Sequence, residues 1–327
     1  NTGFEVEGNL SLIRNPKGFN WDFSFNASLV HNKIIKLPYN GNENNRQGGT
    51  QVFDPKTQQV IWVGGYQEGH TMGDIYAYKQ VKILSDWNEV NTMAGNYIDM
   101  IAGLYGPNVS DADKKKYGLT KPIEPGDVLW ADLDGNHKID QLDRVKVGNI
   151  YPKWTGGFST TLSYKNVSLY GRFDFALGHT ILNMVAMRSL GQSVGFKNII
   201  KEGLKTWTEE NTNTDLPKSY YDDSTNKKNI YRDTKGSDIT SVNDRSSRFY
   251  EKGDYLALRE LTLNWKLPVN WISKVGMTNA SVYITGQNLF YITGYSGSSP
   301  EAPLTYPGVD AGRYPTPRTV LVGASVS

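Results

Sequence analysis

The sequence predicts an all-β fold, a transmembrane antiparallel up-and-down β-barrel, of which this chain supplies about seven C-terminal strands. Three observations predict it: strands with alternating apolar and polar residues, connections that alternate between short and long, and a composition with 33 glycines, 20 tyrosines and 8 tryptophans in 327 residues. Glycine-rich turns joined to aromatic-rich alternating strands are typical of barrels and sandwiches. No stretch reaches the roughly 18 continuous apolar residues of a membrane helix, so a membrane crossing would have to use strands.

The alternation has a period of two, which places successive side chains on opposite faces of a strand. In the clearest hairpin, Phe158, Leu162 and Phe173 fall on one face, while Ser159 and Arg172 fall on the other. The same pattern predicts seven strands, at residues 3–14, 19–35, 154–164, 167–182, 251–267, 281–293 and 317–327.

The connections between these strands are unequal. Short connections at 15–18, 165–166 and 268–280 alternate with long ones at 36–153, 183–250 and 294–316. If the strands run up and down, every short connection lies at one end of the barrel and every long one at the other. Outer-membrane barrels have this asymmetry, with short periplasmic turns and long extracellular loops. We therefore expect the C-terminus on the periplasmic side and short helices within the long extracellular loops, including one or two between residues 181 and 207.

Seven strands cannot close around a lumen and would leave two exposed edges. We therefore expect residues 1–327 to be the C-terminal portion of a larger barrel, whose plug domain and N-terminal strands are absent from this sequence. A soluble cell-surface carbohydrate-binding β-sandwich is the alternative, although the predicted strands are longer than the five or six residues usual in soluble sheets. An open diffusion porin also fits the strand pattern.

Composition excludes several other classes of protein. Thirty-five Lys and Arg against 33 Asp and Glu leave a formal charge of +2, too small and too evenly spread for a nucleic-acid groove. There are no cysteines, so thiol nucleophiles and thiolate metal sites are excluded. The four histidines, at 31, 70, 137 and 179, form no zinc-binding pair. We assign no catalytic residue and expect no enzymatic activity.

One acidic stretch has the spacing of a calcium-binding loop. Positions 1, 3, 5, 9 and 12 of such a loop carry oxygen ligands and position 7 offers a backbone carbonyl. His137 occupies position 6, where the tight loop favours Gly, and the last ligand is the shorter Asp instead of Glu. The alternative is an acidic turn that is hydrogen-bonded to its own backbone. The candidate ligands of a possible Ca²⁺ ion are Asp132, Asp134, Asn136, Lys138 through its carbonyl, Asp140 and Asp143.

Short motifs occur in order through most of the chain and resemble those of the SusC/RagA type of TonB-dependent outer-membrane transporter. The chain opens on N-x-G-F-E at residues 1–5, and a P-G-D segment at 125–127 precedes D-L-D-G-N at 132–136. Two departures are His137, where the family usually has Gly, and a terminal aromatic residue, which would follow Ser327. Further similar segments are Asp143-Arg144, Gly156-Gly157-Phe158, Trp207-Thr208, Gly253-Asp254-Tyr255-Leu256, Gly286-Gln287-Asn288-Leu289-Phe290, Pro300-Glu301 and Tyr314-Pro315-Thr316-Pro317-Arg318.

The resemblance implies a barrel of about 22 strands in the outer membrane of a Gram-negative bacterium. It implies that the intact protein imports oligosaccharides or peptides with a SusD-type surface lipoprotein as a lid, and that TonB acts through the missing N-terminal region. Apolar strand faces would then contact outer-membrane lipid. Polar faces would line the lumen through residues such as Glu7, Arg172, Asp174 and Lys266. The residues that contact the cargo are not assigned.

Overall fold

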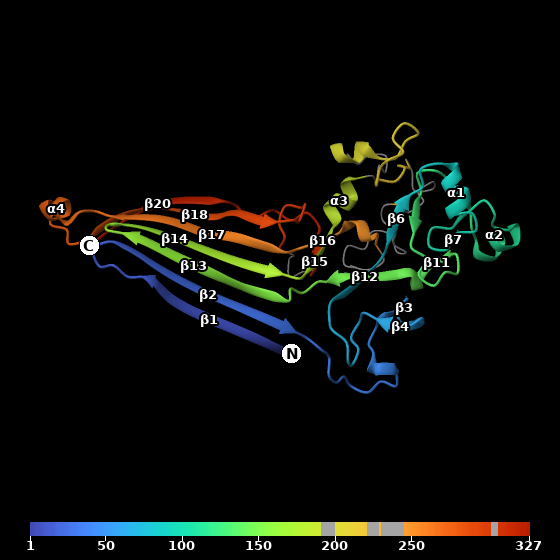
Figure 1. The fold of residues 1–327 in the computed structure, drawn as a ribbon, viewed down its shortest axis with the longest axis horizontal. Helices are drawn as coiled ribbons and strands as arrows, with labels where there is room; N and C mark the ends of the chain where they lie inside the picture. Colours follow the sequence, from blue (N-terminus) through green and yellow to red (C-terminus); the bar gives the residue numbers. More distant parts are fainter. Residues whose placement is uncertain (191–199, 221–228, 230–244, 302–306) are drawn as a thin grey trace.

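The computed structural model describes residues 1–190, 200–220, 229, 245–301 and 307–327. Its main element is one antiparallel sheet of seven strands in the order β1-β2-β13-β14-β17-β18-β20 (Figure 1). Each long strand pairs with the next long strand along the chain, which confirms the predicted seven-strand up-and-down order. The strands are β1 (Thr2–Ile13), β2 (Phe19–His31), β13 (Trp154–Tyr164), β14 (Val167–Leu177), β17 (Tyr255–Lys266), β18 (Ala280–Thr293) and β20 (Thr319–Val326).

The register of these strands joins their apolar residues into one continuous apolar face. Phe158 of β13 lies opposite Phe25 of β2 and Phe173 of β14, and the rings of Phe158 and Phe173 stack with centroids 4.6 Å apart. Many of these side chains are exposed on the surface. Among the described residues no second sheet covers them, as a sandwich would require. The exposed members include Phe4, Val6, Leu10, Leu169, Leu261, Leu263, Ile284, Phe290, Ile292, Val320 and Val322.

The opposite side of the sheet is a polar face. Glu7 and Asp174 belong to one row of paired residues across it, and Arg172 lies opposite Glu260 on the neighbouring strand. Opposite charges at paired positions stabilise a sheet, and Arg172 with Glu260 is such a pair. Glu7, Arg172, Asp174 and Lys266, the residues predicted to line a lumen, therefore share one face.

The apolar face has the height of a bilayer core. Trp154 and Tyr164 stand at the two ends of β13 on this face, ten residues apart in an unbroken register. At about 3.3 Å per residue and a tilt of about 40°, ten residues rise about 25 Å, which is the height of the apolar band of an outer-membrane barrel. Aromatic residues at both ends of such a band are its usual boundary.

Two predicted strands were too long, because each breaks at a glycine. The predicted strand 167–182 divides at Gly178, whose φ of +88° ends β14, and the chain resumes as β15 (Thr180–Asn183). The predicted strand 251–267 divides at Gly253 and Asp254, into β16 (Tyr250–Lys252) and β17. The Asp254 carboxylate accepts a hydrogen bond from the Gly178 N–H at 2.5 Å, so the points at which the two predicted strands divide are bonded to each other. β15 then pairs with β16 and with β19 (Val309–Asp310) in a separate small sheet.

Two other predicted strands differ at one end. The predicted strand 19–35 ends at His31, because Asn32 and Ile34 instead bond to Met72 and His70, at 2.7 and 2.9 Å. The predicted strand 317–327 begins at Thr319, since Pro317 has no N–H to donate to a neighbouring strand.

The predicted loop 36–153 is a folded unit with strands of its own, which the sequence reasoning did not predict. Its buried side chains, among them Tyr78, Leu84, Val90, Tyr97 and Trp130, form one core cluster. Its elements are η1 (Glu43–Asn45), β3 (Thr50–Asp54), β4 (Gln59–Val63), β5 (Asp74–Tyr78), β6 (Gln80–Ile83), α1 (Trp87–Met93), β7 (Ile98–Asp99), β8 (Leu104–Tyr105), α2 (Asp111–Tyr117), β9 (Lys121–Pro122), β10 (Val128–Trp130), β11 (Lys138–Ile139), η2 (Gln141–Asp143) and β12 (Arg144–Asn149).

The second long connection contributes to the same core. Trp207 is buried in it, and its indole N–H donates to the Ser85 carbonyl at 3.2 Å. Between residues 181 and 207, where one or two short helices were expected, the described residues form the end of β15, α3 (Met184–Ser189) and η3 (Lys201–Lys205), while 191–199 lie outside the described residues. The connection ends with η4 (Ser247–Phe249).

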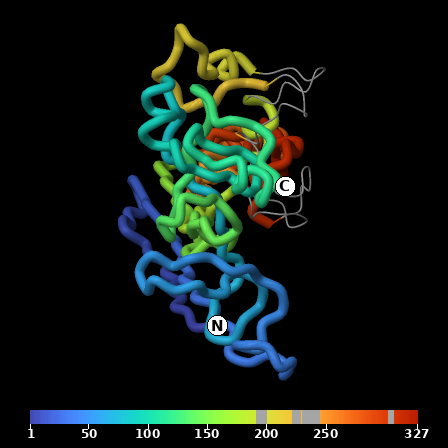
Figure 2. The backbone as a smooth tube through the Cα atoms, turned by 90° about the vertical axis from the view of Figure 1, so that its right-hand side faces the viewer, coloured from blue at the N-terminus to red at the C-terminus, as the bar shows by residue number. Residues whose placement is uncertain are grey.

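The predicted asymmetry of the two ends is confirmed. The turns after β1 and β13, the link with α4 (Val269–Ile272) and η5 (Ser273–Val275), and the C-terminus lie at one end, and the long connections lie at the other (Figure 1). Figure 2 looks onto the end with the long connections, where they gather side by side. In the part of the chain that the structure describes, no helix is long and apolar enough to cross a membrane.

Candidate functional site

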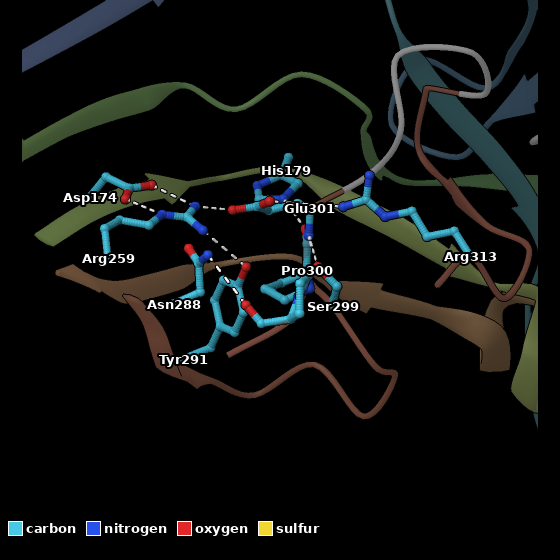
Figure 3. A network of polar contacts seen from close by, with 10 residues as sticks. Asp174, His179, Arg259, Asn288, Tyr291, Ser299, Pro300, Glu301 and Arg313 are labelled. Atoms are coloured by element: carbon cyan, nitrogen blue, oxygen red, sulfur yellow. Dashed lines mark hydrogen bonds and ion pairs between the residues drawn. The ribbon is translucent and has the colours of Figure 1, made fainter. Parts of the chain in front are cut away.

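An ion-pair network lies where the polar face meets the long connections (Figure 3). The Arg259 guanidinium contacts the Asp174 carboxylate at two points, of which the Nη2–Oδ2 hydrogen bond measures 2.8 Å. Arg259 also donates to the Tyr291 hydroxyl at 3.1 Å and forms an ion pair with Glu301. Because a guanidinium matches a carboxylate at two points, Arg259 holds three chain segments in a fixed arrangement.

A β-bulge brings Arg259 to this position. Arg172 and Phe173 are consecutive in β14, but their partners in β17 are Glu260 and Leu258, so Arg259 is an extra residue. Without the bulge, Arg259 would share the apolar face with Leu261 and Leu263. Bulges are one way in which a strand redirects a side chain. The sequence carries a signal of it that was overlooked, because leucines occupy even positions at 256 and 258 and odd positions at 261 and 263.

The network fastens the segment after β18 to the sheet. Glu301 contacts Arg259 and lies 3.8 Å from Arg313, and the neighbouring Pro300 carbonyl lies 3.3 Å from His179 Nε2. Further along, the Tyr295 hydroxyl donates to the buried Asp310 carboxylate at 2.7 Å, and burial raises the pKa of Tyr295. The segment after β18 is therefore fixed beside the polar face, at the end of the sheet where the long connections lie.

Two concave surfaces lie beside the ion-pair network and the segment after β18. A groove of about 470 Å³ lies on the polar face, between Glu7, Arg172, Asp174 and Arg259. A larger pocket of about 1050 Å³ lies among the long connections, with Arg248 and Arg313 in its lining. The rest of that lining mixes apolar side chains, among them Val185, Leu190, Ile200 and Leu216, with amides and hydroxyls. These polar residues are Asn183, Ser189, Asn211, Asn213, Thr214, Ser296 and Ser298.

The acidic loop brings together three of its six predicted ligands. Carboxylate oxygens of Asp132, Asp134 and Asp143 lie within 4.8 Å of one another. Oxygens that share one Ca²⁺ at about 2.4 Å lie at most about 4.8 Å apart, so this spacing fits a cation. Both oxygens of Asp132 also accept backbone hydrogen bonds, from Gly135 at 2.9 Å and His137 at 2.8 Å.

The other predicted ligands have different roles. Asp140 lies outside the group, because its carboxylate caps η2 by accepting from Leu142 at 2.7 Å. The Asn136 side-chain oxygen accepts from the Lys138 amide at 2.7 Å, and Lys138 itself begins β11. His137 adopts a φ of +62°, the left-handed conformation that favours glycine.

Burial shapes the electrostatics of this loop. Asp143 is 1% exposed, and burial raises its pKa to about 7, even though its oxygens accept hydrogen bonds from Leu133 at 2.8 Å and Asp140 at 2.9 Å. Burial also raises the pKa of Asp134, with a further contribution from Asp132. A bound cation would relieve the cost of three clustered carboxylates.

Known proteins resemble this chain along its whole length. TonB-dependent receptor P3 of Formosa agariphila is 30% identical over 335 residues, which cover 100% of this chain and 28% of that receptor. TonB-dependent receptor SusC of Bacteroides thetaiotaomicron is 25% identical over 338 residues, which cover 100% of this chain and 26% of SusC. The chain belongs to the SusC/RagA-type TonB-dependent receptors. No protein-family model matches it.

Solved structures show the same fold. The RagAB peptide transporter superimposes on 99% of this chain and 28% of the transporter chain, with a TM-score of 0.61 and 20% identity. The RagAB peptide importer in the closed-closed state gives a TM-score of 0.59 at 21% identity. The seven-strand sheet therefore has the fold of part of a TonB-dependent receptor barrel, and the similarity to TonB-dependent receptors along the whole chain assigns it to the outer membrane of a Gram-negative bacterium. This receptor chain spans between a quarter and a third of the length of the curated relatives that it matches.

Proposed function

We propose that residues 1–327 form the C-terminal barrel wall and outer loops of a receptor that imports nutrients across the outer membrane. One observation carries the proposal: all seven strands share a single apolar face about as tall as a bilayer core, and the long connections lie only at one end of it. The similarity to TonB-dependent receptors, including SusC, supports the same function.

The proposed cargo is an oligosaccharide or a peptide. The similarity to SusC supports the first, and the fold shared with a structure described as a peptide transporter supports the second. A SusD-type lipoprotein would close over the loop end, and TonB would act through the plug to release the cargo. Within this scheme residues 1–327 form scaffold and loop surface and carry out no covalent chemistry.

Growth of the source bacterium on defined nutrients tests this proposal. A strain without the receptor gene would be compared with the complemented strain on oligosaccharides and on peptides as sole nutrient, each with and without TonB. We expect a growth defect on one nutrient class that complementation repairs only when TonB is present. Repair without TonB would indicate an open diffusion porin, and no defect on either class would contradict nutrient import.

We also propose that the acidic loop binds Ca²⁺. Asp132, Asp134 and Asp143 would supply carboxylate oxygens to the ion, which would stabilise the turn before β11 and so the loop unit around it. Titration of the purified receptor with Ca²⁺ after EDTA treatment would test this, with Asp134→Asn as the variant. We expect Ca²⁺ to raise the unfolding temperature of the wild type and to have a smaller effect on the variant. Equal responses would contradict a calcium site at this loop.

A further inference from the structure

The link between β17 and β18 exposes an apolar cluster at the turn end of the sheet. Val269, Trp271 and Val275 are 66%, 60% and 68% exposed, while Ile272 between them is 4% exposed. Ile272 thus lies on the buried side of the short helix α4, whereas the other three side chains stay largely exposed. A tryptophan and two valines exposed together in a turn are costly in water.

The apolar cluster continues the apolar face of the sheet. The ring of Trp271 meets the ring of Trp265 edge to face, with centroids 6.0 Å apart and planes at 86°. Trp265 in turn lies opposite Val167 and Val282, which are members of the apolar face. Because the apolar face meets lipid, α4 lies on the lipid side of the barrel wall and not over the lumen.

The charges around α4 suit a phospholipid surface. No Asp or Glu occurs between Glu260 and Glu301, whereas Lys266 and Lys274 flank α4. The other two turns at this end carry Arg14, Lys17 and Lys165, again with no acidic residue between positions 12 and 21 or between 163 and 173. Positive charge beside exposed tryptophan is the usual composition of a membrane interface, where the indole lies at headgroup level.

We propose that α4 and η5 form a membrane anchor, in which Val269, Trp271 and Val275 insert into the phospholipid leaflet at the turn end of the barrel. The anchor would fix the height of the barrel wall in the bilayer on this side. The inference goes beyond transport, but it rests on the proposed contact of the apolar face with lipid. Water or a periplasmic protein could instead surround the cluster, and the following experiment separates these cases.

Fluorescence quenching by brominated lipid measures the depth of one tryptophan at a time. The intact receptor would be reconstituted into phosphatidylcholine vesicles with and without bromine on the acyl chains. Three variants, Trp271→Phe, Trp265→Phe and Trp87→Phe, give the contribution of each tryptophan by difference from the wild type. Trp87 is the matched control, because it is 57% exposed but lies in α1 at the loop end.

We expect brominated lipid to quench the Trp271 and Trp265 contributions at least twofold and to leave the Trp87 contribution unchanged. Quenching of Trp265 without quenching of Trp271 would overturn the anchor and leave the lipid-facing barrel wall intact. Quenching of neither would overturn both the anchor and the proposed lipid contact of the apolar face. A periplasmic protein as the occupant predicts the first of these failures, because the purified receptor lacks that protein.

Discussion

Arg259 and Asp174 join neighbouring strands by a two-point ion pair, although the period of β17 would have placed Arg259 on the apolar face. The ion pair depends on the bulge, because without the extra residue the guanidinium would lie on the apolar face, away from Asp174 and Glu301. The pair thereby couples the barrel wall to the segment that contains Glu301.

Arg259→Lys should loosen that segment without changing the charge. A lysine cannot contact Asp174 at two points and also reach Tyr291 and Glu301. We therefore expect the free energy of unfolding to fall by about 1–2 kcal/mol, after allowance for partial solvent exposure. Urea unfolding of the intact receptor and proteolysis after residue 294 would measure it. Arg172→Lys is the control, because Arg172 is exposed on the same face. Equal effects of both substitutions would contradict a special role for Arg259.

His137→Gly should stabilise the acidic loop. His137 has a φ of +62°, where a non-glycine residue costs about 1 kcal/mol, and glycine removes that cost. Thermal unfolding and Ca²⁺ titration of the variant would show a higher midpoint and tighter binding. Gly135→Ala makes the reverse change at φ +74°, where an added Cβ meets no atom within 4 Å, and should destabilise by a similar amount. A destabilised His137→Gly variant would show that the imidazole itself matters.

Local stability around Asp143 should fall as pH rises from about 4 to about 7 in the absence of Ca²⁺. The pKa of Asp143 is raised to about 7 by burial, so the folded state retains a proton that the unfolded chain releases near its ordinary pKa of 3.8. Hydrogen exchange of the Leu133 and Asp140 amides, which bond to this carboxylate, would report the effect after correction for intrinsic rates. Asp143→Asn should remove this pH dependence, and an unchanged slope in the variant would assign it to another group.

Adjacent residues of β13 should respond oppositely to a charge. Phe158→Arg places a cation against lipid near the middle of the strand, at a cost of about 2–4 kcal/mol, whereas Ser159→Arg adds one to the polar face. Heat-modifiability on gels and the amount of receptor in the outer membrane would measure folding. We expect only Phe158→Arg to lower the amount of folded receptor. A lower amount for Ser159→Arg alone would invert the assignment of the two faces.

The long strands were predictable because each carries its own signal, a period of two between turn residues, as in residues 154–164. The breaks at Gly178 and Gly253 were harder to predict, since the pairing of β15 with β16 and β19 decides them. The loop core escaped prediction because it joins residues as distant as Tyr97, Trp130 and Trp207, and no local pattern reports such contacts.

The acidic loop shows the same limit. Its spacing predicted six ligands, but local hydrogen bonds decide which side chains converge, and Asp140 is used as a helix cap instead. The Arg259 network was missed altogether, since its partners come from β14, β18 and the segment after it. The shift of the leucines from even to odd positions was its one signal in the sequence.

Spin labels on consecutive residues of β13 test the two-faced barrel wall most directly. Residues 1–327 contain no cysteine, so single cysteines from Phe158 to Ser163 can carry the label in the intact receptor in lipid vesicles, once any cysteine elsewhere in the receptor is replaced by serine. We predict that even positions are accessible to oxygen and shielded from a water-soluble nickel chelate, and that odd positions show the reverse. Even positions shielded from both reagents would mean a buried core, as in a soluble sandwich, and would contradict a strand face in contact with lipid.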